Sequence, residues 1–167
     1  MATGRMVVLG TYKRLHVTDP YRREFQVRWA DLDPNGHLRH SAYMDYAAQA
    51  RVGFLNECGF TLERFQKMRL GPVLFREDTQ YLREVRANER ISVTTELSGL
   101  SANEKHWRMR HCIFKADNSL ACVIDVQGTW LDLATRKTVP APAELQAALH
   151  KMPHAQDYAE FTPQRPT

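Results

Sequence analysis

The sequence has few cysteines and no long run of apolar residues. Its cysteines, Cys58, Cys112 and Cys122, are odd in number, and no two of them have C-x-x-C spacing. They predict neither a disulfide framework nor a structural zinc site, and we interpret them as small buried side chains in a reducing compartment. Apolar runs such as Met6 to Leu9 are far shorter than the roughly 20 residues that cross a bilayer, so we expect no membrane span.

Targeting and nucleic-acid signals are also missing. The N-terminal stretch has too short an apolar run for a secretory signal and no small-residue cleavage site, so we expect a cytoplasmic protein. The net charge is +4, from 23 basic and 19 acidic residues, without a block of like charges. This balance predicts no nucleic-acid partner and suits a soluble anionic ligand. Serine-hydrolase, nucleotide-hydrolase and metalloprotease motifs are absent, and we expect neither a metal nor a cofactor.

The composition is that of a folded globular domain. Hydrophobic residues make up 43% of the chain and charged residues 25%, close to the average for such domains. The length of 167 residues fits one domain. We place this domain over residues 1–167, with a core at about 20–145 and a loosely structured or draped C-terminal tail at 146–167.

Hydrophobic spacing predicts an α+β fold with an antiparallel sheet. Residues 24–29 alternate as a strand, and residues 40–58 have helical spacing with small side chains that would let a curved sheet approach closely. We expect further helices at 61–68 and 143–150, and strands in hairpin succession at 73–83, 89–98, 105–115 and 119–131. One helix leaves much of such a sheet uncovered, so we expect a dimer, tetramer or other homo-oligomer.

Polar side chains gather on the turn between the first strand and the long helix. Within ten residues lie Asp31, Asp33, Asn35, His37 and His40. One interpretation is an ordinary turn rich in Asx residues before a helix N-terminus. The other is an acyl-transfer site, because helix N-terminal N–H groups can stabilise an oxyanion and a nearby carboxylate can act as base or nucleophile.

A family resemblance favours the second interpretation. The run Val27-Arg28-Trp29-Ala30-Asp31-Leu32-Asp33-Pro34-Asn35-Gly36-His37, with His40-Ser41-Ala42-Tyr43 and Ala50-Arg51 after it, resembles the N-terminal signature of hotdog-fold acyl-CoA thioesterases of the 4-hydroxybenzoyl-CoA thioesterase type. The resemblance covers about residues 20–145. It implies a hotdog fold, in which about five antiparallel strands wrap one long central helix.

The same resemblance implies roles for individual residues. Asp33 would be the catalytic carboxylate, acting as base or nucleophile, and the backbone N–H near His40 would polarise the thioester carbonyl. Asp31 would be structural. The resemblance also leads us to expect substrate contacts from Gly36, Ser41 and Tyr43.

Acyl-ACP thioesterases, which are also hotdog proteins, offer a second similarity. They carry an Asp-x-Asn-x-His pattern, matched by Asp33, Asn35 and His37, and a later Glu that Glu84 in Tyr81-Leu82-Arg83-Glu84 loosely resembles. On this version Asn35 and His37 orient the carboxylate and water, and Glu84 assists as base. His37 and Glu84 are otherwise ordinary solvated surface residues.

Coenzyme A needs cations for its phosphates and a slot for its acyl group. The candidate phosphate ligands are Lys105, Arg108, Arg110, Arg136 and Lys137. The candidate pocket aromatics, which are otherwise core residues, are Trp29, Tyr43, Phe54 and Phe75.

The sequence thus predicts a thioesterase that hydrolyses acyl-CoA, with coenzyme A as part of the substrate. An acyl-ACP thioesterase is the nearest alternative. More distant ones are a hotdog enoyl-CoA hydratase or dehydratase and a non-catalytic acyl-CoA binding domain.

Overall fold

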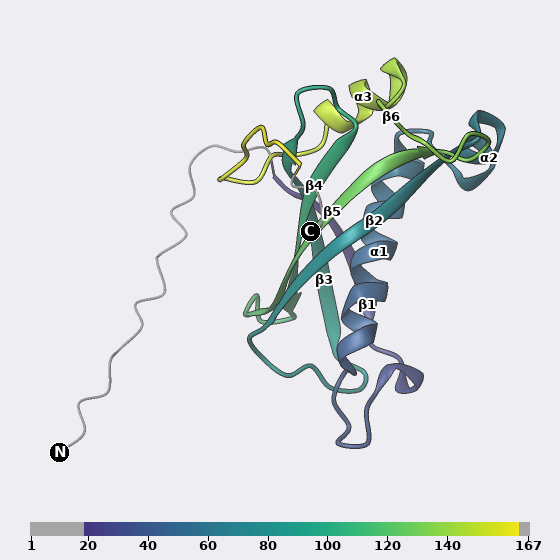
Figure 1. The fold of residues 1–167 in the computed structure, drawn as a ribbon. Helices are drawn as coiled ribbons and strands as arrows, with labels where there is room; N and C mark the ends of the chain where they lie inside the picture. The colour runs from purple at the N-terminus through teal and green to yellow at the C-terminus, as the bar shows by residue number, and fades with distance from the viewer. Residues whose placement is uncertain (1–18, 164–167) are drawn as a thin grey trace.

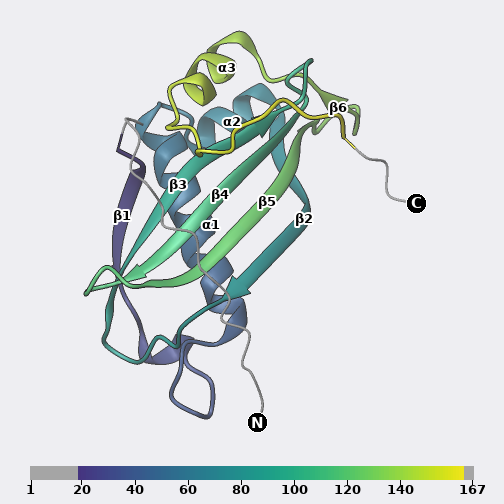
Figure 2. The same cartoon turned by 90° about the vertical axis from the view of Figure 1, so that its left-hand side faces the viewer.

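The computed structural model describes residues 19–163, which are built around one antiparallel sheet. The strands are β1 (Tyr21–Gln26), β2 (Leu70–Tyr81), β3 (Arg90–Leu100), β4 (His106–Lys115), β5 (Leu120–Asp132) and β6 (Thr138–Val139). They lie in the order β1-β3-β4-β5-β2, and the short β6 pairs with the end of β5 (Figure 2). β2 therefore forms one edge of the sheet over its whole length.

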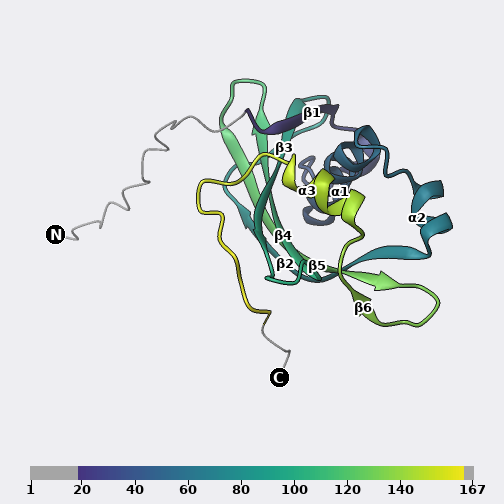
Figure 3. The same cartoon turned by 90° about the horizontal axis from the view of Figure 1, so that it is seen from above.

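The long helix α1 (His40–Glu57) lies against one face of the sheet, which curls around it (Figures 1 and 3). Several of the buried side chains of the helix are small, among them Ala42, Ala47 and Ala50. A Cβ atom on Gly53 would lie 2.1 Å from the Arg23 guanidinium of β1. Small residues therefore let the sheet approach the helix closely, as the sequence predicts.

The core lies between α1 and the inward-facing side chains of the central strands. Large side chains such as Trp107, Ile113, Ile124 and Trp130 are fully buried there, and each contributes roughly 1.5–3 kcal/mol through burial. Glycine is required at position 128 of β5, because a Cβ atom there would lie 2.2 Å from the Trp107 ring. The buried core and the curled sheet fix α1 and place its N-terminus at one end of the fold.

The first strand differs from its expected bounds. It spans Tyr21–Gln26 instead of residues 24–29, and a 3-10 helix, η1 (Trp29–Asp31), follows it. The chain turns at this point because the Asp31 side chain is buried and ion-paired. Trp29, expected in a pocket or the core, is instead 84% exposed. The expectation for Trp29 was therefore wrong.

The remaining elements follow the expected order along the chain, but β2 and β3 do not form the expected hairpin. β2 pairs with β5 at one edge of the sheet, and residues 82–89 carry the chain to β3, which lies between β1 and β4. α2 (Leu62–Met68) begins after its N-cap Thr61, and α3 (Ala143–His150) has the expected bounds. β6 was not expected, because two residues are too few to show a period. The end of the chain is draped along β3: the Leu97 amide donates to Pro153 O at 2.8 Å and the Phe161 amide to Leu100 O at 3.1 Å. Across residues 19–163, we find no helix long and apolar enough to cross a membrane.

Candidate functional site

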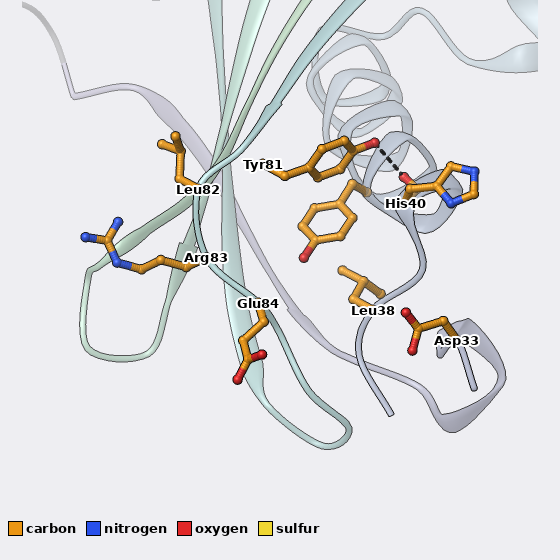
Figure 4. Close-up of a pocket in the computed structure, with 8 residues that line it drawn as sticks. Asp33, Leu38, His40, Tyr81, Leu82, Arg83 and Glu84 are labelled. Carbon is orange, nitrogen blue, oxygen red and sulfur yellow. Dashed lines mark hydrogen bonds between the residues drawn. The ribbon is translucent and has the colours of Figure 1, made fainter. Parts of the chain in front are cut away.

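A pocket of about 390 Å³ opens at the N-terminal end of α1. Its walls come from two segments that are distant in sequence, the loop that leads into α1 and the chain that leaves β2 (Figure 4). The lining residues are Asp33, Leu38, His40, Tyr43, Tyr81, Leu82, Arg83 and Glu84. Backbone contacts hold the two segments together, since the Leu38 amide donates to Val85 O at 2.7 Å and His37 bridges to Arg86.

The loop at residues 33–37 is closed around the Asp33 carboxylate. Its Oδ1 atom accepts hydrogen bonds from the amides of Asn35 at 2.8 Å and His37 at 3.0 Å. Gly36 has φ +78°, which glycine adopts without strain. Among the described residues, the second carboxylate oxygen, Oδ2, has no hydrogen-bond partner. One oxygen thus fixes the carboxylate, and the other is available to a ligand.

Asp31 lies in a different environment from Asp33. It is buried, and it accepts two hydrogen bonds from the Arg28 guanidinium, at 2.8 and 2.9 Å, and one from the Tyr46 hydroxyl at 2.8 Å. The hydrogen bonds from Arg28 hold the pKa of Asp31 below its usual range, and that from Tyr46 acts in the same direction. Every described partner of this carboxylate belongs to the scaffold, so Asp31 anchors the turn on α1.

The N-terminus of α1 faces the pocket with free donors. The N-cap residue Arg39 makes no side-chain capping bond, and no acceptor among the described residues binds the amides of His40 and Ser41. The positive end of the helix dipole lies at the same place. The His40 carbonyl accepts a hydrogen bond from the Tyr81 hydroxyl at 3.2 Å, which ties β2 to the helix start (Figure 4). The His40 side chain itself is exposed.

His37 and Glu84, 47 positions apart in sequence, meet at the pocket. His37 Nε2 lies 3.0 Å from Glu84 Oε2. Glu84 also accepts from the Arg86 guanidinium, which is the main reason why its pKa lies below the usual value. The structure therefore brings the Asp33 loop, His37 and Glu84 together. Asn35 contributes its backbone amide to Asp33, and its side chain is exposed.

Two tyrosines form an apolar wall of the pocket. Tyr43 of α1 and Tyr81 of β2 pack edge to face, with ring centroids 5.2 Å apart. Burial raises the pKa of Tyr43 to about 12, so its hydroxyl stays neutral at physiological pH. Sequence patterns predict no role for Leu38, Tyr81 or Arg83 themselves. The only available signal was the Tyr81-Leu82-Arg83-Glu84 segment at the end of an expected strand.

Two other candidate pocket aromatics lie elsewhere. Phe54 packs against Tyr21 of β1. Phe75 packs against His106 in the middle of β2, six positions before Tyr81. Neither lines the pocket.

The candidate phosphate ligands are not at this pocket within one chain. Tyr81 pairs with Cys122 of β5 and Arg108 pairs with Gln127, which places them about 17 Å apart along the strand. Arg108 lies over the Phe161 ring at 3.8 Å, and Arg110 binds Asp125 and Asp157. Lys105, Arg136 and Lys137 lie at that same distant end of the sheet, beside β6. Ser41 is exposed on the first turn of α1, and Gly36 is exposed in the Asp33 loop.

The arrangement can support acyl transfer without a metal. Within residues 19–163, no three His, Cys, Asp or Glu side chains are grouped to hold a metal ion. The pocket instead offers a fixed carboxylate, a His–Glu pair and unoccupied helix N–H groups. A carboxylate that faces oxyanion donors across a small pocket matches the requirements of acyl transfer.

Comparison with known proteins identifies the family. Residues 27–149 match the model of the thioesterase-like superfamily. Among solved structures, a Staphylococcus aureus protein in complex with CoA has a TM-score of 0.74 at 17% identity, over 92% of this chain and 94% of that one. A 1,4-dihydroxy-2-naphthoyl-CoA thioesterase from Synechocystis has a TM-score of 0.72 at 18% identity, over 78% and 96%. An Aquifex aeolicus protein has a TM-score of 0.72 at 24% identity, over 78% of this chain and 99% of that one. The chain belongs to the thioesterase-like superfamily and has the hotdog fold.

Proposed function

We propose that this protein hydrolyses acyl-CoA thioesters to the free acid and CoA. The observation that carries the proposal is the Asp33 carboxylate. Its Oδ1 is fixed by two amides, and its Oδ2 is available in a pocket that the N-terminus of α1 also lines. Support comes from the thioesterase-like family and from the CoA bound in the Staphylococcus aureus structure.

The mechanism follows from these two groups. The thioester carbonyl oxygen lies against the amides of His40 and Ser41, which stabilise the negative charge that develops on it. In one route Asp33 takes a proton from an attacking water, and collapse of the tetrahedral intermediate expels CoA as its thiolate and gives the free acid. In the other Asp33 attacks the carbonyl carbon itself and expels the thiolate, which leaves a mixed anhydride on Asp33 that water then hydrolyses to the free acid. The loop amides that hold Oδ1 orient the carboxylate for either route.

Self-association belongs to the same proposal. β2 is an edge strand of 12 residues, and its exposed apolar side chains include Val73 and Phe75. Such an edge pairs readily with a second strand. If two copies pair antiparallel through β2, the far end of one copy, with Arg136 and Lys137, comes alongside the pocket of the other. The candidate phosphate ligands that lie far from the pocket within one chain would then be supplied by its partner, in addition to Arg83 of the pocket itself.

An acyl-ACP thioester is the second candidate substrate. The observation that favours it is the 3.0 Å contact between His37 and Glu84, the two residues that the acyl-ACP pattern assigns beside Asp33. The enzyme chemistry is unchanged, and only the carrier of the acyl group differs.

The test is thiol release from a panel of short, long and aromatic acyl-CoAs, measured with a thiol reagent. Asp33→Ala should lower kcat by roughly 10²–10⁴-fold, the usual contribution of a positioned acid or base. The matched control is Asp117→Ala. Asp117 closes a similar turn by accepting from the Ser119 amide at 2.9 Å, but it lies in the β4–β5 hairpin. Equal loss in both variants, or no thiol release by the wild type, would sink the proposal.

The same assay separates the two carriers. Acyl-ACP and acyl-CoA with one acyl group are compared by kcat/KM, and Glu84→Gln is measured with each. A preference for acyl-ACP together with a large loss in Glu84→Gln supports the second candidate. A preference for acyl-CoA with little loss in that variant supports the first.

A further inference from the structure

A buried arginine without an anionic partner lies beyond the pocket on α1. Arg51 is mostly buried between the helix and the sheet, with its guanidinium carbon 5.9 Å from the centre of the Trp107 ring. No described carboxylate lies within salt-bridge distance of it, and the nearest one to act on its charge is that of Glu77 on β2. A buried cation normally has a paired anion, because desolvation is costly. Arg51 therefore requires an explanation.

Within residues 19–163, the one side chain hydrogen-bonded to Arg51 is a neutral histidine. Arg51 NH1 lies 3.1 Å from His111 Nε2, and His111 Nδ1 lies 3.0 Å from Thr95 Oγ1. Burial, and then the charge of Arg51, lower the pKa of His111 to about 3. The ring is therefore uncharged, so Nε2 accepts from Arg51 and Nδ1–H donates to Thr95. This arrangement orients the guanidinium but does not neutralise it.

Two further unpaired donors lie on the tryptophans that pack beside Arg51. The indole N–H groups of Trp107 and Trp130 are buried and have no partner among the described residues. Both tryptophans are fully buried, and their ring centroids are 5.8 Å apart. Buried donors without acceptors cost free energy. The two indole N–H groups and the Arg51 guanidinium make the interior beneath the second half of α1 rich in hydrogen-bond donors. A site that binds an anionic oxygen requires such donors.

This donor-rich region is aligned with the catalytic pocket. Met44, Ala48 and Arg51 occupy one face of α1 at spacings of four and three, and the Thr79 hydroxyl of β2 lies 3.7 Å from Met44 Sδ. The pocket residue Tyr43 directly precedes Met44 on α1, and the pocket residue Tyr81 lies two positions after Thr79 on β2. Between Met44 and Arg51, α1 carries the small side chains of Ala47 and Ala48, and Met44 itself is unbranched and flexible.

The distance suits a medium-length acyl group. His40 and Arg51 are eleven positions apart on α1, so their Cα atoms lie about 16 Å apart. The arginine side chain leans toward the helix N-terminus, which shortens the gap from the oxyanion site to the guanidinium to about 10 Å. An extended acyl chain of roughly six to eight carbons spans that gap.

We propose that Arg51, oriented by His111, binds a carboxylate at the far end of the acyl group, so that the preferred substrates are monothioesters of dicarboxylic acids. The inference rests on the proposed thioesterase function and names its substrate class. The acyl chain enters past Tyr43 and Tyr81, displaces the side chain of Met44 and lies along Ala47 and Ala48. Its terminal carboxylate then takes up the guanidinium donors that His111 leaves free.

The test compares thioesters that differ only in the terminal group. Adipoyl-CoA is measured against hexanoyl-CoA, and suberoyl-CoA against octanoyl-CoA, by thiol release. The wild type should favour the carboxylated member of a pair by at least about tenfold in kcat/KM. Arg51→Met should abolish this preference and leave the rate on the uncharged member within about threefold. Arg51→Lys should restore part of the preference, because it restores the charge.

The matched control is Arg64→Met. Arg64 of α2 also lies over an aromatic ring, that of Phe60, but it has its own carboxylate partner, Glu144. This variant should keep the wild-type preference. A wild type that favours the uncharged acyl groups, or an Arg51→Met variant that loses both activities equally while remaining folded, would overturn the inference.

A binding measurement separates this inference from the proposed hydrolysis. Calorimetric titration of the Asp33→Asn variant with adipoyl-CoA and hexanoyl-CoA needs no turnover. Tighter binding of adipoyl-CoA, lost in Asp33→Asn/Arg51→Met, supports the carboxylate site even if no thioester is hydrolysed. Equal binding of the two thioesters refutes the site, whatever the hydrolysis assay shows.

Discussion

At the scale of single residues, His111 links stability to pH. Burial and the charge of Arg51 hold its pKa at about 3, against about 6.5 in an unfolded chain. The unfolded state therefore binds one more proton between these values, and the stability present above pH 6.5 falls as the pH decreases. We expect a loss of about 1.4 kcal/mol per pH unit from this one group below its unfolded pKa. Urea unfolding of the wild type and His111→Gln at pH 6.5 and 5.0 measures it. The variant should lose less stability over this interval, and parallel losses would contradict the assignment.

Contacts between residues close in the sequence were predictable from it, and contacts between residues far apart in the sequence were not. The roles of Asp31 and Asp33 differ because of neighbours within a few positions, such as Arg28 and the loop amides. A short sequence motif contains both partners of such contacts, so the motif can predict them. The pairing of Arg51 with His111 joins residues 60 positions apart, and it depends on how β4 lies under α1. Composition and spacing contain no trace of that contact.

At the scale of elements, the C-terminal segment acts as a strap over β3. A Cβ atom at Gly99 would lie 2.5 Å from the carbonyl oxygen of Ala159. We expect Gly99→Ala to push the strap away, to weaken the bond from the Phe161 amide to Leu100 O, and to cost about 1–3 kcal/mol. Hydrogen exchange at Ala159 and Phe161 should become faster, and Ser98→Ala is the neighbouring control. Unchanged exchange at both amides would show that the strap tolerates the added methyl group.

Element order was predictable because period and turn chemistry are local. The bounds of α3 and the hairpin succession of β3, β4 and β5 agree with the hydrophobic spacing. The position of β1 was missed by three residues because alternation continues through Val27, which is buried although it lies beyond the strand. The exposure of Trp29 follows from the turn that Asp31 fixes, and hydrophobicity alone gives the opposite expectation.

At the scale of the whole molecule, the proposed self-association depends on the unpaired edge of β2. Phe75 and Val73 are 45% and 38% exposed on this edge strand, and lysines are typical of edges that do not pair. We expect Val73→Lys/Phe75→Lys to weaken self-association by at least about tenfold. Sedimentation equilibrium measures it, with Leu62→Lys, an exposed site on α2, as the control. A wild type that sediments as a monomer would contradict pairing through β2.

The unusual exposure of Trp29 has a practical consequence. Trp107 and Trp130 are sealed in the core, whereas Trp29 is in contact with solvent four positions before Asp33. The indole emission of the protein therefore divides into a blue component that is insensitive to aqueous iodide and a red component that iodide quenches. The red component comes from the segment that leads into the Asp33 loop. Trp29 is thus an intrinsic fluorescent reporter for the segment before the Asp33 loop, and substrate titrations can be followed without an attached dye.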